Sequence, residues 1–345
     1  MFSRASTIIL LLALLAVSWP ASLTAHASAD RELLASTAST TSPAAAKKVN
    51  VAIQAGHWKA AELPEPLARL RTSTGANGGG RTESQVTLDI AQRVATLLRG
   101  KGLTVEVLPA TVPTGYQADL FISLHADGSA SSSARGYKVS TRWRSEVAAL
   151  DALLVQSVEA GYDRVTGMPQ NGSITRAMRG YYAYSTYRGE DYRLGGETPA
   201  AILEMGFMSN AADRAMMFNK PDLLARGVVA GIDDFYARRA EGLRLHAEVE
   251  RKAAASPFGR SAVVLSDGVN IRDGASTGAR KLATANFGES FPLLERSNVR
   301  PSNSSGGSPG SRGTQLASNS GWYKISIPSA TADAYVTRDL VVVQE

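Results

Sequence analysis

The chain has 345 residues, of which 44% are hydrophobic and none is cysteine. The absence of cysteine excludes disulfides, thiolate metal sites and a lipoprotein anchor. Lys and Arg number 37 against 31 Asp and Glu, giving a net charge of +6. The basic residues form neither a Lys/Arg-rich run nor an aromatic-interleaved patch, so we expect no nucleic-acid binding. The mild positive excess suits either an anionic polymer nearby or simple solubility.

Residues 1–29 have the pattern of a signal peptide. Arg4 supplies a basic start, residues 8–17 form an apolar stretch too short to span a bilayer comfortably, and Ala25-His26-Ala27 is a cleavage signal. The alternative is an uncleaved membrane anchor. No other segment is long and apolar enough to cross a membrane. We therefore expect a secreted, extracytoplasmic protein of the cell wall or periplasm, with no membrane span after cleavage.

Residues 30–47 are rich in Ala, Ser and Thr and predict a flexible spacer. Between residues 48 and 238, strand and helix patterns alternate. This alternation predicts an α/β domain with a mainly parallel sheet and helices on both faces. The expected strands are 49–53, 103–108, 120–124, 137–140 and 200–203, and the expected helices are 84–98, 146–165 and 221–236.

A different pattern follows this domain. Residues 239–257 are charged and Ala-rich and predict a helical linker. Residues 258–345 contain short β runs separated by turns and predict a small all-β barrel. Within it, residues 301–320 form a Ser/Gly/Asn-rich loop.

Two histidines stand at the ends of predicted strands. His57 follows the first strand and His125 follows a later one, and the carboxyl ends of parallel strands share one sheet edge. A catalytic zinc takes three protein ligands, commonly histidines. Without cysteine the third is a carboxylate, and Glu83, at the start of a helix after a Gly-rich loop, is the best candidate. The alternatives are structural histidines and a helix-start acid favoured by the helix dipole.

Glu204 ends a predicted apolar strand, where a lone carboxylate costs several kcal/mol unless it is compensated. A structural ion pair is one explanation. Beside a zinc ion, Glu204 is instead placed to move a proton between a water molecule and a leaving amine.

Four motifs, in order, resemble the zinc-dependent N-acetylmuramoyl-L-alanine amidases. They are a histidine after Ala-Gly, a glutamate opening a helix, a histidine in Ser-Leu-His-Ala and a glutamate in Glu-x-Gly-Phe-x-Ser-Asn, and the resemblance covers residues 48–238. It implies one zinc ion per chain held by His57, Glu83 and His125, and Glu204 as the catalytic residue. The implied reaction is hydrolysis of the amide between N-acetylmuramic acid and L-alanine, so the implied partner is peptidoglycan. No activator protein is identified.

Some positions depart from the family pattern. Gln54 stands where the family usually has Asp, which leaves the support of His57 open. The loop from His57 to Glu83 is longer than usual and carries Trp58. Residues 166–198, rich in Gly, Tyr and Arg, are expected to form a substrate wall, and Arg176 lies where the family often has an arginine near the cleft.

Residues 258–345 resemble bacterial Src-homology-3 domains. The run of residues 269–277 matches their Val-Asn-Val-Arg signature, and Gly321-Trp322-Tyr323-Lys324-Ile325 matches a Gly-Trp-Tyr-Lys-Val strand. The resemblance implies binding to the cell wall, with Trp322 either in the barrel core or on a binding surface. Two other functions remain open: a zinc peptidase or amidase with a different wall substrate, and a non-catalytic wall-binding protein.

Overall fold

The computed structural model describes residues 49–73, 75–184, 186–187, 190–294, 321–327 and 333–344. The predicted signal peptide, the spacer and the loop 301–320 lie outside the described residues. All described residues belong to one compact unit, Lys47–Glu345. No helix among them is long and apolar enough to cross a membrane.

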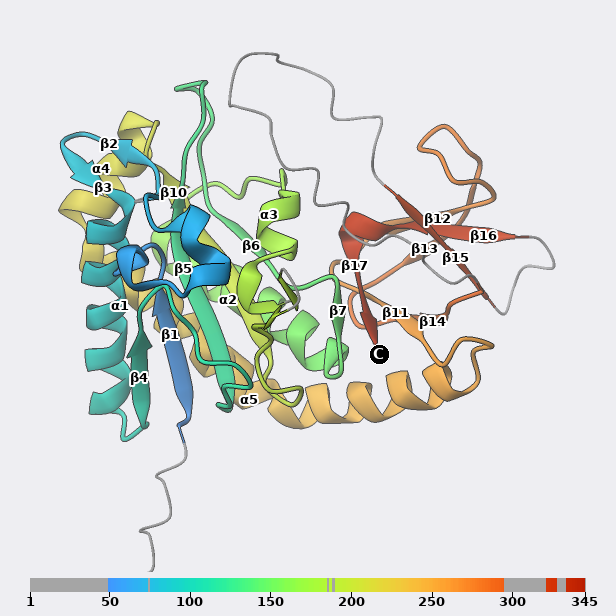
Figure 1. Ribbon diagram of the computed structural model, residues 1–345. Coiled ribbons are helices and arrows are strands. Elements are labelled where there is room, and N and C mark those ends of the chain that lie inside the picture. The colour runs from blue at the N-terminus through green and yellow to red at the C-terminus, as the bar shows by residue number, and fades with distance from the viewer. Residues whose placement is uncertain are drawn as a thin grey trace, which may run out of the picture. The chain divides into compact units, whose positions relative to one another are not determined.

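A five-stranded sheet forms the centre of the N-terminal part (Figure 1). Its order is β4-β1-β5-β10-β6, and only β6 runs antiparallel to its neighbour. The α/β prediction with a mainly parallel sheet is therefore confirmed. The strands are β1 (Val51–Ala55), β4 (Val105–Leu108), β5 (Leu120–Asp127), β6 (Lys138–Ser140) and β10 (Ala200–Phe207).

The three long helices all pack on one face of this sheet. They are α1 (Glu83–Gly100), α2 (Ala148–Thr166) and α5 (Pro221–Ala254). Alternate residues of β1 and β5, such as Ile53 and Ile122, point into this core because successive side chains of a strand face opposite sides. Helix α1 presents Val86, Ile90 and Val94 to it, one apolar residue per turn.

The opposite face is covered by short elements, so the expectation of helices on both faces is only partly right. These elements are η1 (Ala60–Glu62), η2 (Glu65–Leu70), α3 (Arg176–Arg179) and η3 (Tyr182–Tyr184). They pack residues such as Leu67 and Tyr182 against Phe121 and Ile202. Among the described residues, this face is therefore covered by short helical elements and the loops between them.

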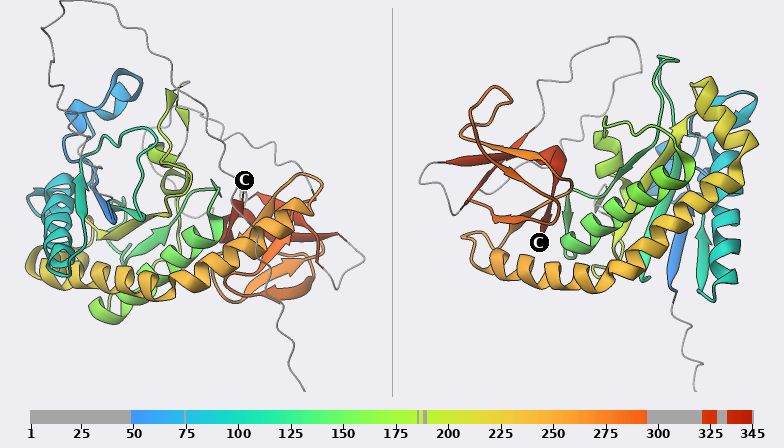
Figure 2. Two further views of the ribbon diagram at one scale, coloured as in Figure 1. Left: turned by 90° about the horizontal axis from the view of Figure 1, so that it is seen from below. Right: turned by 180° about the vertical axis from the view of Figure 1, so that it is seen from behind.

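Helix α5 continues without a break into the predicted linker and ends at Ala254, three residues before the linker's predicted end (Figures 1 and 2). Val249, near its end, packs in one apolar cluster with residues of α2 and of the C-terminal strands. Gly231 lets α2 approach α5 closely, since a Cβ there would lie 2.6 Å from Val158 Cα. The remaining N-terminal elements are β2 (Asn77–Gly78), β3 (Arg81–Thr82), β7 (Arg144–Ser145), β8 (Thr186–Tyr187), β9 (Glu190–Asp191) and α4 (Ala211–Asn219).

The C-terminal part is all β, in two four-stranded sheets. One sheet has the order β13-β12-β16-β15. The other has the order β14-β11-β17-β7 and so takes in β7 of the N-terminal part. Tyr323 is buried in the core between these strands, whereas Trp322 is half-buried. The strands are β11 (Ser261–Val264), β12 (Val269–Arg272), β13 (Lys281–Ala285), β14 (Ser290–Pro292), β15 (Trp322–Ile325), β16 (Ala334–Thr337) and β17 (Val341–Gln344), with η4 (Arg338–Leu340) between the last two.

Candidate metal centre

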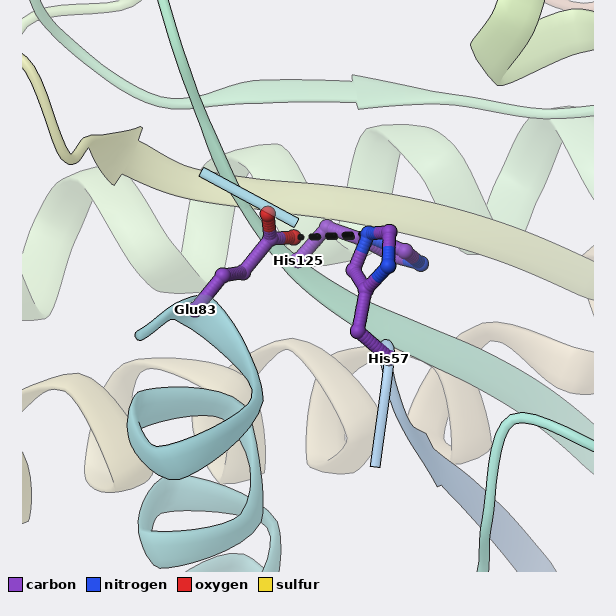
Figure 3. A group of neighbouring side chains, drawn as sticks. All are labelled: His57, Glu83 and His125. Carbon is purple, nitrogen blue, oxygen red and sulfur yellow. Dashed lines mark hydrogen bonds and ion pairs between the residues drawn. The ribbon is translucent and has the colours of Figure 1, made fainter. Parts of the chain in front are cut away.

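Three residues predicted as ligands come together at the carboxyl edge of the sheet. His57, Glu83 and His125 each offer a ligand atom, and these atoms all lie within 4.8 Å of one another. His125 is in β5, His57 follows β1, and Glu83 is the first residue of α1 (Figure 3). The rings of the two histidines are 5.1 Å apart, edge to face.

Glu83 is held in place by its helix and by main-chain donors. Thr82 caps α1 and forms a reciprocal capping box with Gln85, which fixes the start of the helix. The buried Glu83 carboxylate accepts hydrogen bonds from the amides of Ala76 at 2.7 Å and Ala126 at 3.0 Å. It also accepts one from His125 Nδ1 at 2.9 Å. The carboxylate therefore has a single defined orientation toward the histidines.

His57 occupies a strained turn directly after β1. Its φ of 61° lies in the left-handed region, which costs a residue with a side chain on the order of 1–3 kcal/mol. Its Nδ1 lies 3.1 Å from the carbonyl oxygen of Ser73, to which it can donate. In that tautomer Nε2, which lies 3.5 Å from Glu83 Oε1, carries the free lone pair. The Ser73 carbonyl therefore orients the imidazole of His57. It provides the hydrogen-bond support that was left open because Gln54 stands where the family usually has Asp.

Glu83 affects the pKa of both histidines, and both histidines affect the pKa of Glu83. Burial lowers the pKa of His57, although the charge of Glu83 opposes this shift. Burial opposes protonation of His125, but the hydrogen bond and charge of Glu83 outweigh it and raise the pKa of His125. Burial likewise opposes ionisation of Glu83, yet the hydrogen bond from His125 and the charges of both histidines keep its pKa below the usual value.

Glu204 lies beside this cluster. It pairs in register with His125 of β5 on one side and with Lys138 of β6 on the other. Burial raises the pKa of Glu204 to about 8, while the charges of His125 and Lys138 oppose the rise. A carboxyl group whose pKa lies near neutral suits general acid–base work, and a bound dication would lower that pKa.

The residues fit a divalent cation. Among the described residues, the buried atoms His125 Nε2 and Glu204 Oε2 have no hydrogen-bond partner. Buried polar atoms are normally paired, so a cation or water is needed to complete this site. Two imidazoles and one carboxylate form the ligand set of catalytic zinc, whereas calcium and magnesium prefer oxygen ligands alone.

Gln54 belongs to a second, polar layer beneath the site. Its amide donates to Ala110 O at 3.2 Å and to Tyr182 Oη at 3.1 Å, and it accepts from the hydroxyls of Ser123 and, at 2.7 Å, Tyr181. The Tyr181 ring lies 5.5 Å from that of His125. The segment 166–198 thus reaches the site through Tyr181, and Arg176 is exposed at the start of α3.

Sequence reasoning missed Lys138 and Tyr181. Lys138 is 2% exposed and pairs with Asp127, two residues after His125. The available signal for it was a lysine beside Tyr137 and Val139 in a predicted strand. No sequence pattern around Tyr181 predicts its place in the site, because Tyr181 reaches His125 from a distant part of the chain.

Residues 51–234, more than half of the chain, match the N-acetylmuramoyl-L-alanine amidase family. The chain is 30% identical over 158 residues to the N-acetylmuramoyl-L-alanine amidase LytC of Bacillus subtilis, covering 42% of this chain and 29% of that protein. Among solved structures, the amidase AmiC2 of Nostoc punctiforme has a TM-score of 0.39 at 18% identity, over 55% of this chain and 98% of that one. The amidase Ami1 of Mycobacterium smegmatis has a TM-score of 0.40 at 19% identity, over 55% and 97%. On the match over residues 51–234, the chain belongs to the N-acetylmuramoyl-L-alanine amidase family.

Proposed function

We propose that this chain is a zinc-dependent amidase that hydrolyses the bond between N-acetylmuramic acid and L-alanine in peptidoglycan. The observation that carries the proposal is the convergence of His57, Glu83 and His125 within 4.8 Å, beside Glu204, in a chain of this family. His57, Glu83 and His125 would hold one zinc ion. When bound there, zinc acts as a Lewis acid that polarises the substrate carbonyl and lowers the pKa of a water molecule to about 7.

Glu204 carries the proton transfers of this mechanism. It accepts a proton from the attacking water as the new C–O bond forms at the lactyl carbonyl. It then delivers that proton to the alanine nitrogen as the C–N bond breaks. The products are a free carboxylate on the muramic acid and a free amino group on the stem peptide. Lys138, adjacent in register, favours the ionised form of Glu204 that begins the cycle.

Two features outside the catalytic site extend the proposal. Residues 1–29 act as an export signal, which brings the enzyme to peptidoglycan outside the cytoplasm. The C-terminal strands form a domain of the bacterial Src-homology-3 type that binds the wall. The half-buried Trp322 supports this, because it leaves part of an aromatic ring at the surface for contact.

The test is digestion of purified peptidoglycan by the wild type and by Glu204→Gln, followed by mass analysis of the fragments. We expect the wild type to release intact stem peptides with a free N-terminal alanine, and the variant to release none while retaining zinc. Cleavage within the stem would instead indicate a zinc peptidase. Equal activity of both proteins would refute the role of Glu204. Metal analysis should find one zinc per wild-type chain and none in His125→Ala.

A further inference from the structure

The segment from Arg176 to Tyr184 connects the metal centre to the C-terminal strands. We propose that Arg179 is a positioning residue of the active site: the C-terminal strands hold its guanidinium, and through it they hold Tyr181 against His125. The catalytic consequence rests on the proposed function, whereas the structural coupling does not. Its implication is that the C-terminal domain is part of the working active site as well as a wall-binding module.

The guanidinium of Arg179 is buried and bound mainly by C-terminal carbonyls. Arg179 is 1% exposed. Its Nη1 donates to Arg338 O at 2.7 Å, and its Nη2 donates to Val341 O and to Arg142 O. The guanidinium also lies 4.1 Å from the centre of the Trp143 ring. Burial lowers the pKa of Arg179 to about 10, so its charge is held at a cost that these carbonyls offset.

Two of these carbonyls come from the C-terminal part, Arg338 O in η4 and Val341 O in β17, and this part is docked on the N-terminal part. Strand β17 pairs with β7, through Val343 with Arg144 and Gln344 with Ser145. The Gln344 side chain accepts from the amide of Ala148 at 3.0 Å and donates to Glu146 O. Beside these bonds, a small apolar cluster joins alanines of α2 to Val263 and Val342. Main-chain pairing and apolar burial together give Arg179 a fixed anchor.

The other end of the segment lies in the site. Only Gly180 separates Arg179 from Tyr181, so a displacement of one reaches the other within about 7 Å of chain. The Tyr181 hydroxyl donates to Gln54 at 2.7 Å, and its ring lies edge-on to His125. A misplacement of about 1 Å at an active site can reduce the rate about 100-fold. Loosening Arg179 should therefore affect catalysis without removing any metal ligand.

A competing explanation is that the core alone holds the segment. Met178 and Tyr182 on either side are buried in the cluster that covers the sheet. If these two residues suffice, Arg179 contributes only to docking, and Tyr181 keeps its place without it.

Variants in the full-length zinc protein separate the two explanations. Arg179→Met keeps most of the side-chain volume and removes all the donors, whereas Arg179→Lys restores the charge and one donor group. Arg164→Ala, an exposed arginine on α2, is the matched control. We expect Arg179→Met to lower kcat at least tenfold with zinc retained, and to speed hydrogen exchange at residues 180–184 by a similar factor. Arg179→Lys should recover part of both, and Arg164→Ala should match the wild type. Wild-type exchange at residues 180–184 in Arg179→Met would overturn the proposal.

A measurement on the wild type keeps the proposal testable if Arg179→Met does not fold. Native-state hydrogen exchange gives the opening free energy of each protected segment. If the coupling holds, residues 180–184 and 341–344 open as one unit with the same free energy. Clearly different opening free energies would refute the coupling. Because this readout needs no substrate, it distinguishes failure of the coupling from failure of the amidase assignment.

Discussion

Replacing Glu83 by glutamine tests the central claim about the metal centre. The carboxylate accepts three hydrogen bonds, from the amides of Ala76 and Ala126 and from His125 Nδ1. An amide has one oxygen, so its NH₂ group must face at least one of the two main-chain N–H groups. A buried donor left without an acceptor costs about 1–3 kcal/mol. The metal-free variant should therefore lose about that much free energy of unfolding.

Metal binding should fall further, because the substitution also removes a charged ligand. Loss of an outer hydrogen-bond partner alone costs a metal site roughly 10–100-fold in affinity, and loss of a ligand should exceed that. The assays are urea unfolding followed by circular dichroism in the presence of chelator, and zinc competition against a chromophoric chelator. Glu289→Gln, at an exposed position in the C-terminal part, is the control and should change neither. Unchanged zinc affinity in Glu83→Gln would refute the ligand assignment.

Three further predictions address the surroundings of the site. Because Glu83 raises the pKa of His125, protons should compete with zinc for His125 at a higher pH than they would for an ordinary histidine. Zinc affinity should therefore already decline above the ordinary histidine pKa of about 6.5. Chelator competition at a series of pH values checks this, and a constant affinity would contradict it. Gly56→Ala should abolish zinc binding and lower the melting temperature, because a Cβ at this position would lie 2.6 Å from both His125 Cε1 and Leu124 O. Gly172→Ala is the control: a Cβ there meets nothing within 4 Å, so this variant should behave as the wild type. Gln54→Leu should remove one hydrogen-bond partner from each of the buried hydroxyls of Ser123, Tyr181 and Tyr182. The free energy of unfolding, measured with urea, should fall by about 1–3 kcal/mol for each group left unpaired. An unchanged urea midpoint would mean that this network contributes nothing to stability.

Local sequence patterns were enough to predict the five strands of the central sheet and the three long helices. Apolar runs predicted the parallel strands, because these strands are buried on both faces. Apolar residues once per turn predicted α1, because only one face of that helix is buried. Helix α4 was missed, although Asn210 caps it by accepting from the amides of Ala212 and Asp213. The sequence of strand β13 has no clear alternation, and its pairing with β12 defines it as a strand.

The sequence by itself determined the chemical groups of the site. His57 and His125 follow buried strands, Glu204 ends one, and Glu83 opens a helix, so strand direction alone brings three of them to one sheet edge. The distances among the ligands, the Ser73 contact that selects the His57 tautomer, and the pairing of Glu204 with Lys138 came only from the structure.

Tertiary structure alone decided which distant segments complete the site. Tyr181 reaches His125, Gln54 binds three hydroxyl groups from two other segments, and Arg179 is held by carbonyls of Arg338 and Val341. These contacts join residues with long sequence separation and no periodic pattern. Their geometry depends on how the whole chain packs, whereas the positions of the strand-end histidines and of Glu204 follow from their immediate sequence neighbours.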